Sequence, residues 1–383
     1  MTLQIYKVGG AVRDQLLGIE ATDNDYVVVG SSKAEMLALG FIEVGRDFPV
    51  FLHPTTHEEY ALARRDKKTG AGYHGFEFDT SSQITLEDDL LRRDITINAM
   101  ALDENGNVID PFNGQQDLEH KIIRHVSAAF SEDPLRVLRA ARFSAQLDFS
   151  VAPETLQLMQ HLVVSGELSA LSSERVWMEI NKALMTAHIG NFFIVLHRVD
   201  ALAQVLPGLE VVMQDASSKL EFLNLLSQIA TDSSSYSLAQ RFAIVQFYAM
   251  WHTASPITQS TPKPLLPAYA SANNQCKQLA TLLLTTYAAI ANLKQLNSSA
   301  IDTLIRRLDP IRSPQRYAEL CSIIQLISKT KLTHTIEPNL HILSIMVNKI
   351  KQIDYKAIVA QHNKVDLEVA IKQIKLDIIE ELL

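Results

Sequence analysis

The first residues that could do chemistry are two glycines, Gly9-Gly10, and two carboxylates further along the chain, Asp23 and Asp25. A double glycine lets the backbone come close to a phosphate chain, and Arg13 can add positive charge there. Carboxylates two residues apart on an extended segment point to the same side, so they can hold one or two Mg²⁺ ions against a triphosphate. We therefore expect a nucleotidyl transfer centre whose catalytic, metal-binding residues are Asp23 and Asp25.

This motif has other interpretations. A D-x-D pair alone is common in surface loops, but the preceding glycines and the β-branched run after Asp25 favour catalysis here. Glu59 is either a third metal-binding carboxylate or an exposed strand residue. The chain contains no G-x-x-x-x-G-K-[ST] motif, so we do not expect ATP hydrolysis coupled to work.

A second group of polar residues follows Thr85, where the apolar spacing predicts a helix that continues through Asn98. On such a helix Asp94 and Asn98 stand one turn apart on one face, where both could hydrogen-bond a ribose. Arg93 could reach a phosphate, because the guanidinium fork fits phosphate oxygens. The alternative is an ordinary charged helix face.

A third group lies on a helix predicted after Ser131, which is expected to be its N-cap. At about 100° per residue, one polar half of this helix carries Asp133, Arg136, Arg139 and Arg142. Asp133 and Arg136 can contact one planar partner, with the carboxylate accepting from an exocyclic amine and the guanidinium donating to a ring nitrogen. Cytosine and adenine fit this pair, and uracil and guanine do not. The alternative is an intrahelical salt bridge.

The elements that must position these residues are strands near the N-terminus and helices elsewhere. The expected strands are 3–9, 25–30, 48–52, 59–63 and 108–109. Helices are expected at 13–17, after Ser32, after Thr85, at 115–120 and in most of the chain beyond Ser131. The glycine-rich, basic segment 65–76 predicts a loop, either solvated or a mobile lid over the triphosphate. Residues 253–267, with four prolines, predict a linker.

The composition limits the class of protein. The chain has 383 residues, 47% hydrophobic and 20% charged, which predicts two to four subdomains. It has no apolar run long enough for a membrane span and no signal-peptide core at the N-terminus. Cys276 and Cys321 have no zinc spacing, so a reduced, cytoplasmic protein is expected. The net charge of −8 argues mildly against nucleic-acid binding, yet the arginines at 124–142 could form a basic lining.

Taken together, the motifs resemble those of the class II tRNA nucleotidyltransferases, the bacterial CCA-adding enzymes of the polymerase β superfamily. The matching pieces are Gly9-Gly10, Asp23-x-Asp25, Arg92-Arg93-Asp94-x-Thr96-x-Asn98, Asp110-Pro111-x-x-Gly114 and Glu132-Asp133-x-x-Arg136. Residues 173–176 resemble the family's fifth motif, which braces the nucleotide-binding helix. The resemblance is dense from residue 3 to about residue 180.

The resemblance implies an α+β fold: a polymerase β-like head with a small antiparallel sheet, then an all-α neck, body and tail arranged as a seahorse. The corresponding ranges are 1–130 for the head, 131–210 for the neck, 211–270 for the body and 271–383 for the tRNA-binding tail. Some bacterial relatives carry a C-terminal phosphohydrolase domain with a His-Asp motif. No His-Asp dipeptide follows the neck, so we expect no such activity.

The resemblance also implies roles for single residues. Asp23 and Asp25 would bind Mg²⁺, and Asp133 and Arg136 would select the base. ATP or CTP would be bound by Gly10, Arg13, Arg93, Arg139 and Arg142. The acceptor arm of tRNA would lie along neck, body and tail, recognised by its backbone shape. No DNA or membrane partner is expected, and a monomer is favoured.

The expected function is therefore addition and repair of the 3′-terminal CCA of tRNA from CTP and ATP, without a template. The nearest alternative is bacterial poly(A) polymerase, whose members usually have longer basic extensions. Relatives that add only CC or only A share the same site residues. A catalytically silent RNA-binding protein on this scaffold is a fourth reading, against which the intact Asp23 and Asp25 speak.

Overall fold

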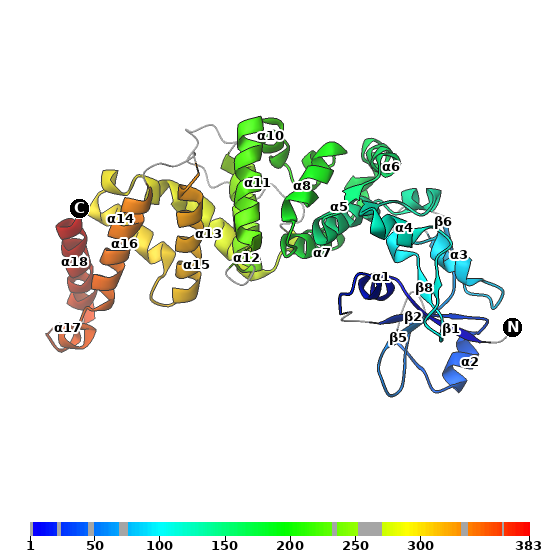
Figure 1. The fold of residues 1–383 in the computed structure, drawn as a ribbon. Coiled ribbons are helices and arrows are strands. Elements are labelled where there is room, and N and C mark those ends of the chain that lie inside the picture. Colours follow the sequence, from blue (N-terminus) through cyan, green and yellow to red (C-terminus); the bar gives the residue numbers. More distant parts are fainter. Residues whose placement is uncertain are drawn as a thin grey trace. The chain divides into compact units, whose positions relative to one another are not determined.

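Two strands at the start of the chain, β1 (Gln4–Val8) and β2 (Asp25–Val29), pair antiparallel inside a larger sheet. The computed structural model describes residues 3–20, 24–44, 50–68, 76–231, 236–251, 270–330, 336–361 and 364–383. The chain divides into two compact units, Met1–Val205 and Leu206–Leu383. The first unit combines strands and helices, and the described elements of the second are helices (Figure 1). The expected α+β class is confirmed.

The main sheet has seven strands in the order β3-β4-β5-β2-β1-β8-β9. Its remaining strands are β3 (Ile42–Glu43), β4 (Val50–Leu52), β5 (Glu59–Leu62), β8 (Ala101–Leu102) and β9 (Val108–Ile109). The strand pairs of this sheet are antiparallel, as expected, except that β2 and β5 are parallel. Parallel neighbours need a crossover connection, which here contains α2 (Lys33–Ala38), β3 and β4.

Both faces of this sheet are buried. Val27 and Val29 of β2 join one hydrophobic cluster and Val28 joins another, as expected from the alternation of side chains along a strand. Met36 of α2 packs in the Val28 cluster, and Leu90 packs in the other. The predicted cap of α2 is confirmed, since the Ser32 side chain accepts a hydrogen bond from the backbone N–H of Glu35.

The two ends of the segment predicted as a glycine-rich loop pair with each other as a hairpin. Strands β6 (Arg65–Lys68) and β7 (Phe76–Asp79) pair antiparallel, so the loop prediction is wrong at both ends. A two-stranded ribbon tolerates charged residues because backbone hydrogen bonds, and not core packing, hold it. The centre of the proposed lid, residues 69–75, and the predicted linker, residues 253–267, lie outside the described residues.

The helix predicted after Thr85 is shorter than expected. It is α3 (Leu86–Leu91), followed by a separate turn of 3₁₀ helix, η1 (Thr96–Asn98), so Asp94 and Asn98 do not share a helix face. After α3 the backbone pairs with residues 124–126. The N–H of Thr96 donates to the carbonyl of Arg124, and the N–H of Val126 donates to the carbonyl of Asp94. The β-branched Ile95 is extended and bridges to His125, a geometry that β-branched residues favour over helix.

The arginine helix also begins later than expected. Ser131 lies in a 3₁₀ helix, η2 (Ala128–Glu132), and the arginine helix is α5 (Leu135–Leu147), so Ser131 is not its N-cap. The reason is Pro134, which disfavours helical backbone at the preceding residue. Asp133 is extended and takes the capping role, since its Oδ1 accepts from the backbone N–H of Leu135 at 3.0 Å.

The rest of the first unit packs around α5, which contacts α7 (Ser173–Leu184) and α8 (Ile189–Arg198). The remaining elements of this unit are α1 (Gly10–Leu16), α4 (Gly114–Glu119), β10 (Ile122–Ile123), β11 (Ser150–Val151), α6 (Pro153–Val164), η3 (Glu167–Ala170) and α9 (Leu202–Val205). Between α5 and α7, Nε of the buried Arg142 donates to Oε2 of the buried Glu179 at 2.6 Å.

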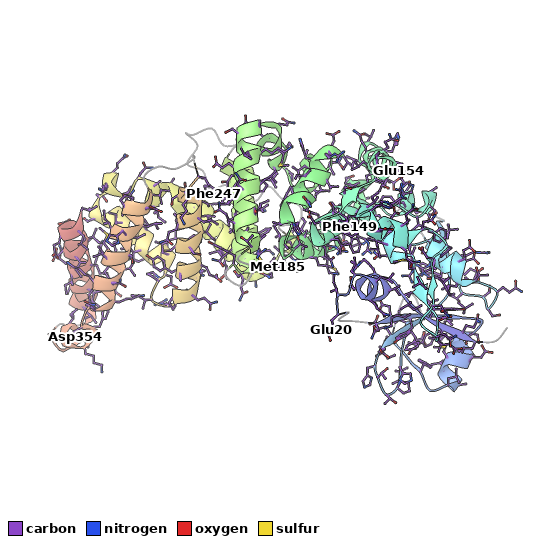
Figure 2. All side chains as sticks on the ribbon, viewed as in Figure 1. Glu20, Phe149, Glu154, Met185, Phe247 and Asp354 are labelled. Atoms are coloured by element: carbon purple, nitrogen blue, oxygen red, sulfur yellow. The ribbon has the colours of Figure 1, made fainter. Side chains whose placement is uncertain are left out.

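The second unit is built on the pair α12 (Leu238–Trp251) and α13 (Asn274–Ala291). The ring of Phe247 on α12, labelled in Figure 2, lies 4.6 Å from that of Tyr287 on α13. The other helices are α10 (Leu209–Gln214), α11 (Ala216–Thr231), η5 (Leu293–Gln295), α14 (Ser298–Leu308), α15 (Pro314–Ser328), α16 (Ile336–Lys351), α17 (Tyr355–Gln361) and α18 (Lys364–Leu382). None of the described helices is long and apolar enough to span a bilayer. The division into head, neck, body and tail stays a prediction.

We expect the Glu179→Ala variant to lose about 3 kcal/mol of unfolding free energy, because Arg142 would stay buried without its carboxylate. Glu174 is the matched control, since it lies on the same helix and is exposed. Glu174→Ala should change the stability by no more than about 0.5 kcal/mol. Urea denaturation measures both variants. Equal losses would show that the buried ion pair contributes no more to the free energy of unfolding than an exposed glutamate does.

Candidate active site

The two glycines make the turn from β1 into α1. Gly9 has a φ of 74°, a backbone conformation that favours glycine. A Cβ added at Gly9 would lie 2.9 Å from Nη1 of Arg93, and one at Gly10 would lie 3.4 Å from Nη2 of Arg13. Glycine at these two positions therefore leaves room for two guanidiniums beside the backbone.

Arg13, on α1, is buried next to Gly10. Its Nη1 donates to Oδ1 of Asn98 at 2.7 Å, and its Nε donates to Oδ1 of Asp14 at 2.8 Å. Asn98 thus holds an arginine in place, whereas the sequence suggested that it acts together with Asp94. The 3₁₀ turn η1 is the element that carries Asn98 to Arg13.

Arg93 reaches the same place from the end of α3. Its Nη1 donates to the backbone carbonyl of Asn98 at 3.3 Å, and its Nη2 to Oδ2 of Asp89 at 3.2 Å. Its Nε is buried and has no hydrogen-bond partner among the described residues. Arg93 therefore keeps at least one N–H donor, that of Nε, without a protein partner in the described part of the chain.

Asp89 was not predicted from the sequence. It is fully buried and accepts from both Arg92 and Arg93. Burial by itself would raise the pKa of Asp89, but the two guanidiniums lower it below the usual value. The spacing of i to i+3 and i+4 on a helix is the signal that could have identified these pairs.

Asp94 connects the head to the arginine helix. Its Oδ2 accepts from Nε and Nη2 of Arg139, both at 2.7 Å, and its Oδ1 accepts from the backbone N–H of Ile95. Burial would raise the pKa of Asp94, but Arg139 lowers it overall, and Asp94 in turn raises the pKa of Arg139. Asp94 is thus bound to a protein cation in the site where a ribose was expected.

The arginines meet at one aromatic ring. The guanidinium carbons of Arg13, Arg139 and Arg142 lie 5.3, 5.5 and 4.0 Å from the ring centre of Phe143. Three of the predicted nucleotide-binding arginines are thus close together, and Arg93 joins them through Asn98. Glu179, the partner of Arg142, was not predicted, because it lies 37 residues away in the chain.

Asp133 and Arg136 have partners of their own. Oδ2 of Asp133 accepts from Nη2 of Arg175 at 2.8 Å, so Asp133 does not form the intrahelical salt bridge that was the alternative. Arg136 donates from Nη1 to the carbonyl of Ala129 and from Nη2 to that of Arg92, at 2.8 and 2.7 Å. Both predicted base-selecting residues are therefore held in fixed orientations by neighbouring segments.

The predicted metal site is described in part. Asp25 is the first residue of β2 and is exposed, and Asp23 lies outside the described residues. Glu59 is the register partner of Asp25 on the parallel strand β5, so the two exposed carboxylates lie on one face. No group of three or more metal-ligating side chains occurs within the part of the chain that the structure describes. Carboxylate oxygens on one face fit the ligand preference of Mg²⁺.

Comparison with known proteins gives this geometry a context. A family profile described as "Poly A polymerase head domain" matches residues 5–124, and one described as "Probable RNA and SrmB- binding site of polymerase A" matches residues 148–213. The multifunctional CCA protein of Paraburkholderia phymatum is 42% identical over 363 residues, covering 86% of this chain and 85% of that protein. That of Dechloromonas aromatica is 45% identical over 343 residues, covering 83% and 82%.

Solved structures agree with these relatives. The Bacillus stearothermophilus CCA-adding enzyme in complex with CTP is 25% identical, with a TM-score of 0.64 over 99% of this chain and 89% of that one. A CCA-adding enzyme in complex with ATP shares the fold, with a TM-score of 0.68 at 20% identity over 99% and 86%. The chain belongs to the class II family of CCA-adding tRNA nucleotidyltransferases.

Proposed function

We propose that this chain adds and repairs the 3′-terminal CCA of tRNA, using CTP and ATP and no nucleic-acid template. The observation that carries the proposal is the convergence of four arginines: Arg13 and Arg93 lie beside Gly9-Gly10, and Arg139 and Arg142 lie with Arg13 around one aromatic ring. Four guanidiniums supply the charge and the donors that a triphosphate requires. CCA addition is favoured over poly(A) synthesis because the relatives described above are named multifunctional CCA proteins.

In the proposed mechanism the arginines orient the triphosphate, and Asp23 and Asp25 would hold Mg²⁺. When bound, the metal would neutralise charge on the leaving pyrophosphate and activate the terminal hydroxyl of the tRNA. The buried, unpartnered Nε of Arg93 supports a role for that residue in nucleotide binding. Because Asp94 and Asn98 each bind an arginine, we propose that they position those arginines, in addition to any contact with the ribose.

Base selection is assigned to Asp133 and Arg136. The backbone carbonyls bonded to Arg136 and the guanidinium bonded to Asp133 hold this pair at the start of α5. A carboxylate oxygen can accept a second hydrogen bond, from the exocyclic amine of cytosine or adenine. Fixed orientation favours discrimination, because a pair that cannot rearrange cannot adapt to uracil or guanine.

The cytoplasm is the proposed compartment, and a monomer the proposed oligomeric state.

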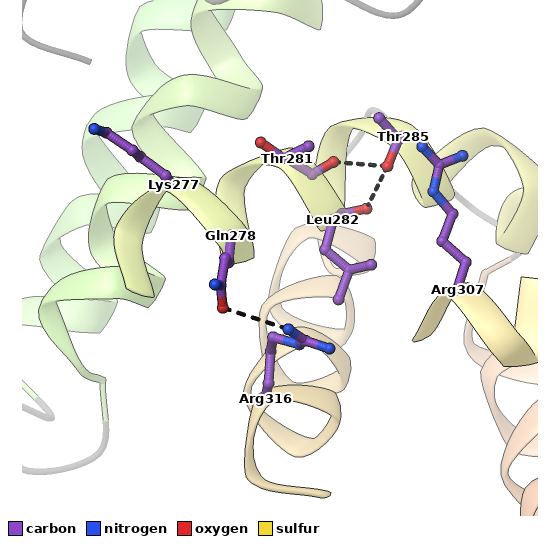
Figure 3. A pocket seen from close by; sticks show the side chains of 7 residues that line it. All are labelled: Lys277, Gln278, Thr281, Leu282, Thr285, Arg307 and Arg316. Atoms are coloured by element: carbon purple, nitrogen blue, oxygen red, sulfur yellow. Dashed lines mark hydrogen bonds between the residues drawn. The ribbon is translucent and has the colours of Figure 1, made fainter. Parts of the chain in front are cut away.

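We propose further that the second unit contacts the tRNA backbone. A depression of about 290 Å³ lies between α13, α14 and α15 and is lined by Lys277, Gln278, Thr281, Leu282, Thr285, Arg307 and Arg316 (Figure 3). Arg316 donates to Gln278 at 3.4 Å and lies 3.8 Å from Asp309, and no carboxylate is among the lining residues. Three cations without a lining carboxylate favour an RNA phosphate.

The activity is tested by feeding the protein a tRNA that lacks its 3′ end with CTP, ATP or both, and sequencing the products. We expect CC with CTP alone and CCA with both nucleotides, because one site accepts both bases. Only CC, only A, or a long A tail would identify the specialised or poly(A)-adding alternatives. The Asp25→Ala and Asp23→Ala variants should bind tRNA but incorporate nothing. Retained incorporation in either would rule out that residue as a metal ligand.

The base-selecting role is tested with Asp133→Ala. The preference for CTP and ATP over UTP and GTP should fall about tenfold, since one edge of the base loses its hydrogen-bond partner. Arg175→Ala is the matched control, because it removes the ion pair with Asp133 and leaves the carboxylate in place. It should lower the preference less than Asp133→Ala does, because the carboxylate remains although its orientation is no longer fixed. The same loss of preference in both variants would mean that Asp133 acts only as a brace.

The tail surface is tested with Arg307→Ala, whose side chain is exposed and has no ion-pair partner among the described residues. We expect tRNA binding to weaken several-fold. The slope of log Kd against log salt concentration should fall by about one, the value for one lost phosphate contact. Lys351→Ala is the control, since it removes an exposed charge from the same unit outside the depression. Equal effects would indicate only a general charge effect.

A further inference from the structure

Phe143 is the one side chain that three of the nucleotide-binding arginines share. Its ring is 5% exposed and lies on α5, between the guanidiniums of Arg13, Arg139 and Arg142 at 4.0 to 5.5 Å. Distances within about 6 Å of a ring centre are those at which an aromatic face attracts a cation. The ring therefore contacts one arginine from the head and two from its own helix.

Each of these arginines has a carboxylate partner at hydrogen-bond distance, and Glu179 also lies 4.0 Å from Arg139. The pairs are Arg13 with Asp14, Arg139 with Asp94, and Arg142 with Glu179. The three carboxylates come from α1, from the segment after α3, and from α7. Glu179 links Arg139 with Arg142 only, so among the described contacts the ring is the one that also brings in Arg13.

The chemistry of the ring suits this place better than a carboxylate would. Three guanidiniums at short range repel one another, more strongly when they are buried. A central carboxylate would attract them but would cancel charge that the triphosphate needs. An aromatic ring attracts cations through its quadrupole and carries no net charge. We propose that Phe143 is a positioning residue that holds the three guanidiniums together where they meet the triphosphate. This inference rests on the proposed function.

The kinetic consequence separates this role from catalysis. In Phe143→Leu, KM for both CTP and ATP should rise by about tenfold, because the arginines lose their common contact. The value of kcat should change less, and the preference for C and A over U and G should stay. The Asp133–Arg136 pair, which we assign to base selection, does not contact the ring through any described interaction.

A fluorinated series tests the electrostatic part, because Phe143→Leu also changes packing. Phenylalanine with one, two or three ring fluorines is placed at position 143 of the full chain. Each fluorine withdraws electrons from the ring and weakens its attraction for cations, with little change in size. Calorimetric titration with CTP should show a dissociation constant that rises stepwise, by about tenfold for the third fluorine.

Phe149 is the matched control. It follows the same helix, is also 5% exposed, and makes no cation–π or ring contact with a described residue (Figure 2). The same series at position 149 should leave CTP affinity unchanged. A flat series at position 143, in a chain that binds CTP, would overturn the inference and leave the proposed function standing. An unsubstituted chain that binds neither CTP nor ATP would overturn the proposed function and this inference with it.

Discussion

An ion pair between the buried Asp94 and the partly buried Arg139 joins the arginine helix to the segment after α3. Removing two charges from water is costly, and here the cost is offset by two hydrogen bonds to one carboxylate oxygen and a third from the backbone to the other. The pair joins the turn after α3 to the second turn of α5. A second contact between α1 and α5 lies nearby, where the guanidinium of Arg13 is 5.3 Å from the ring centre of Phe143.

The same design recurs around the site. Each arginine that we assign to the triphosphate has a carboxylate that fixes its orientation: Asp14, Asp89, Asp94 or Glu179. A guanidinium has five donors, so an arginine that is held by a carboxylate can still donate to a phosphate. Fixed orientation reduces the side-chain entropy that nucleotide binding would otherwise cost. The carboxylates thus trade part of the positive field for preorganised donors.

Local sequence patterns were sufficient to predict some elements of the fold. The strands at the start of the chain, the capped helix after Ser32 and the helical character beyond Ser131 follow from alternation, capping chemistry and helical spacing. Helix ends were less predictable. Pro134 delayed α5 through a local backbone effect. The segment after α3 instead pairs with a distant part of the chain, where Thr96 donates to the Arg124 carbonyl.

The sequence by itself determined the chemistry of this protein: which residues carry charge, which glycines admit a phosphate, and which family the motifs resemble. Only the tertiary structure decided the partners. Asn98 holds Arg13, Glu179 holds Arg142, Arg175 holds Asp133, and Phe143 gathers three cations. The physical reason is that residue types and spacings act within a few turns of chain, whereas a buried charge takes its partner from whichever segment packing brings within hydrogen-bond distance.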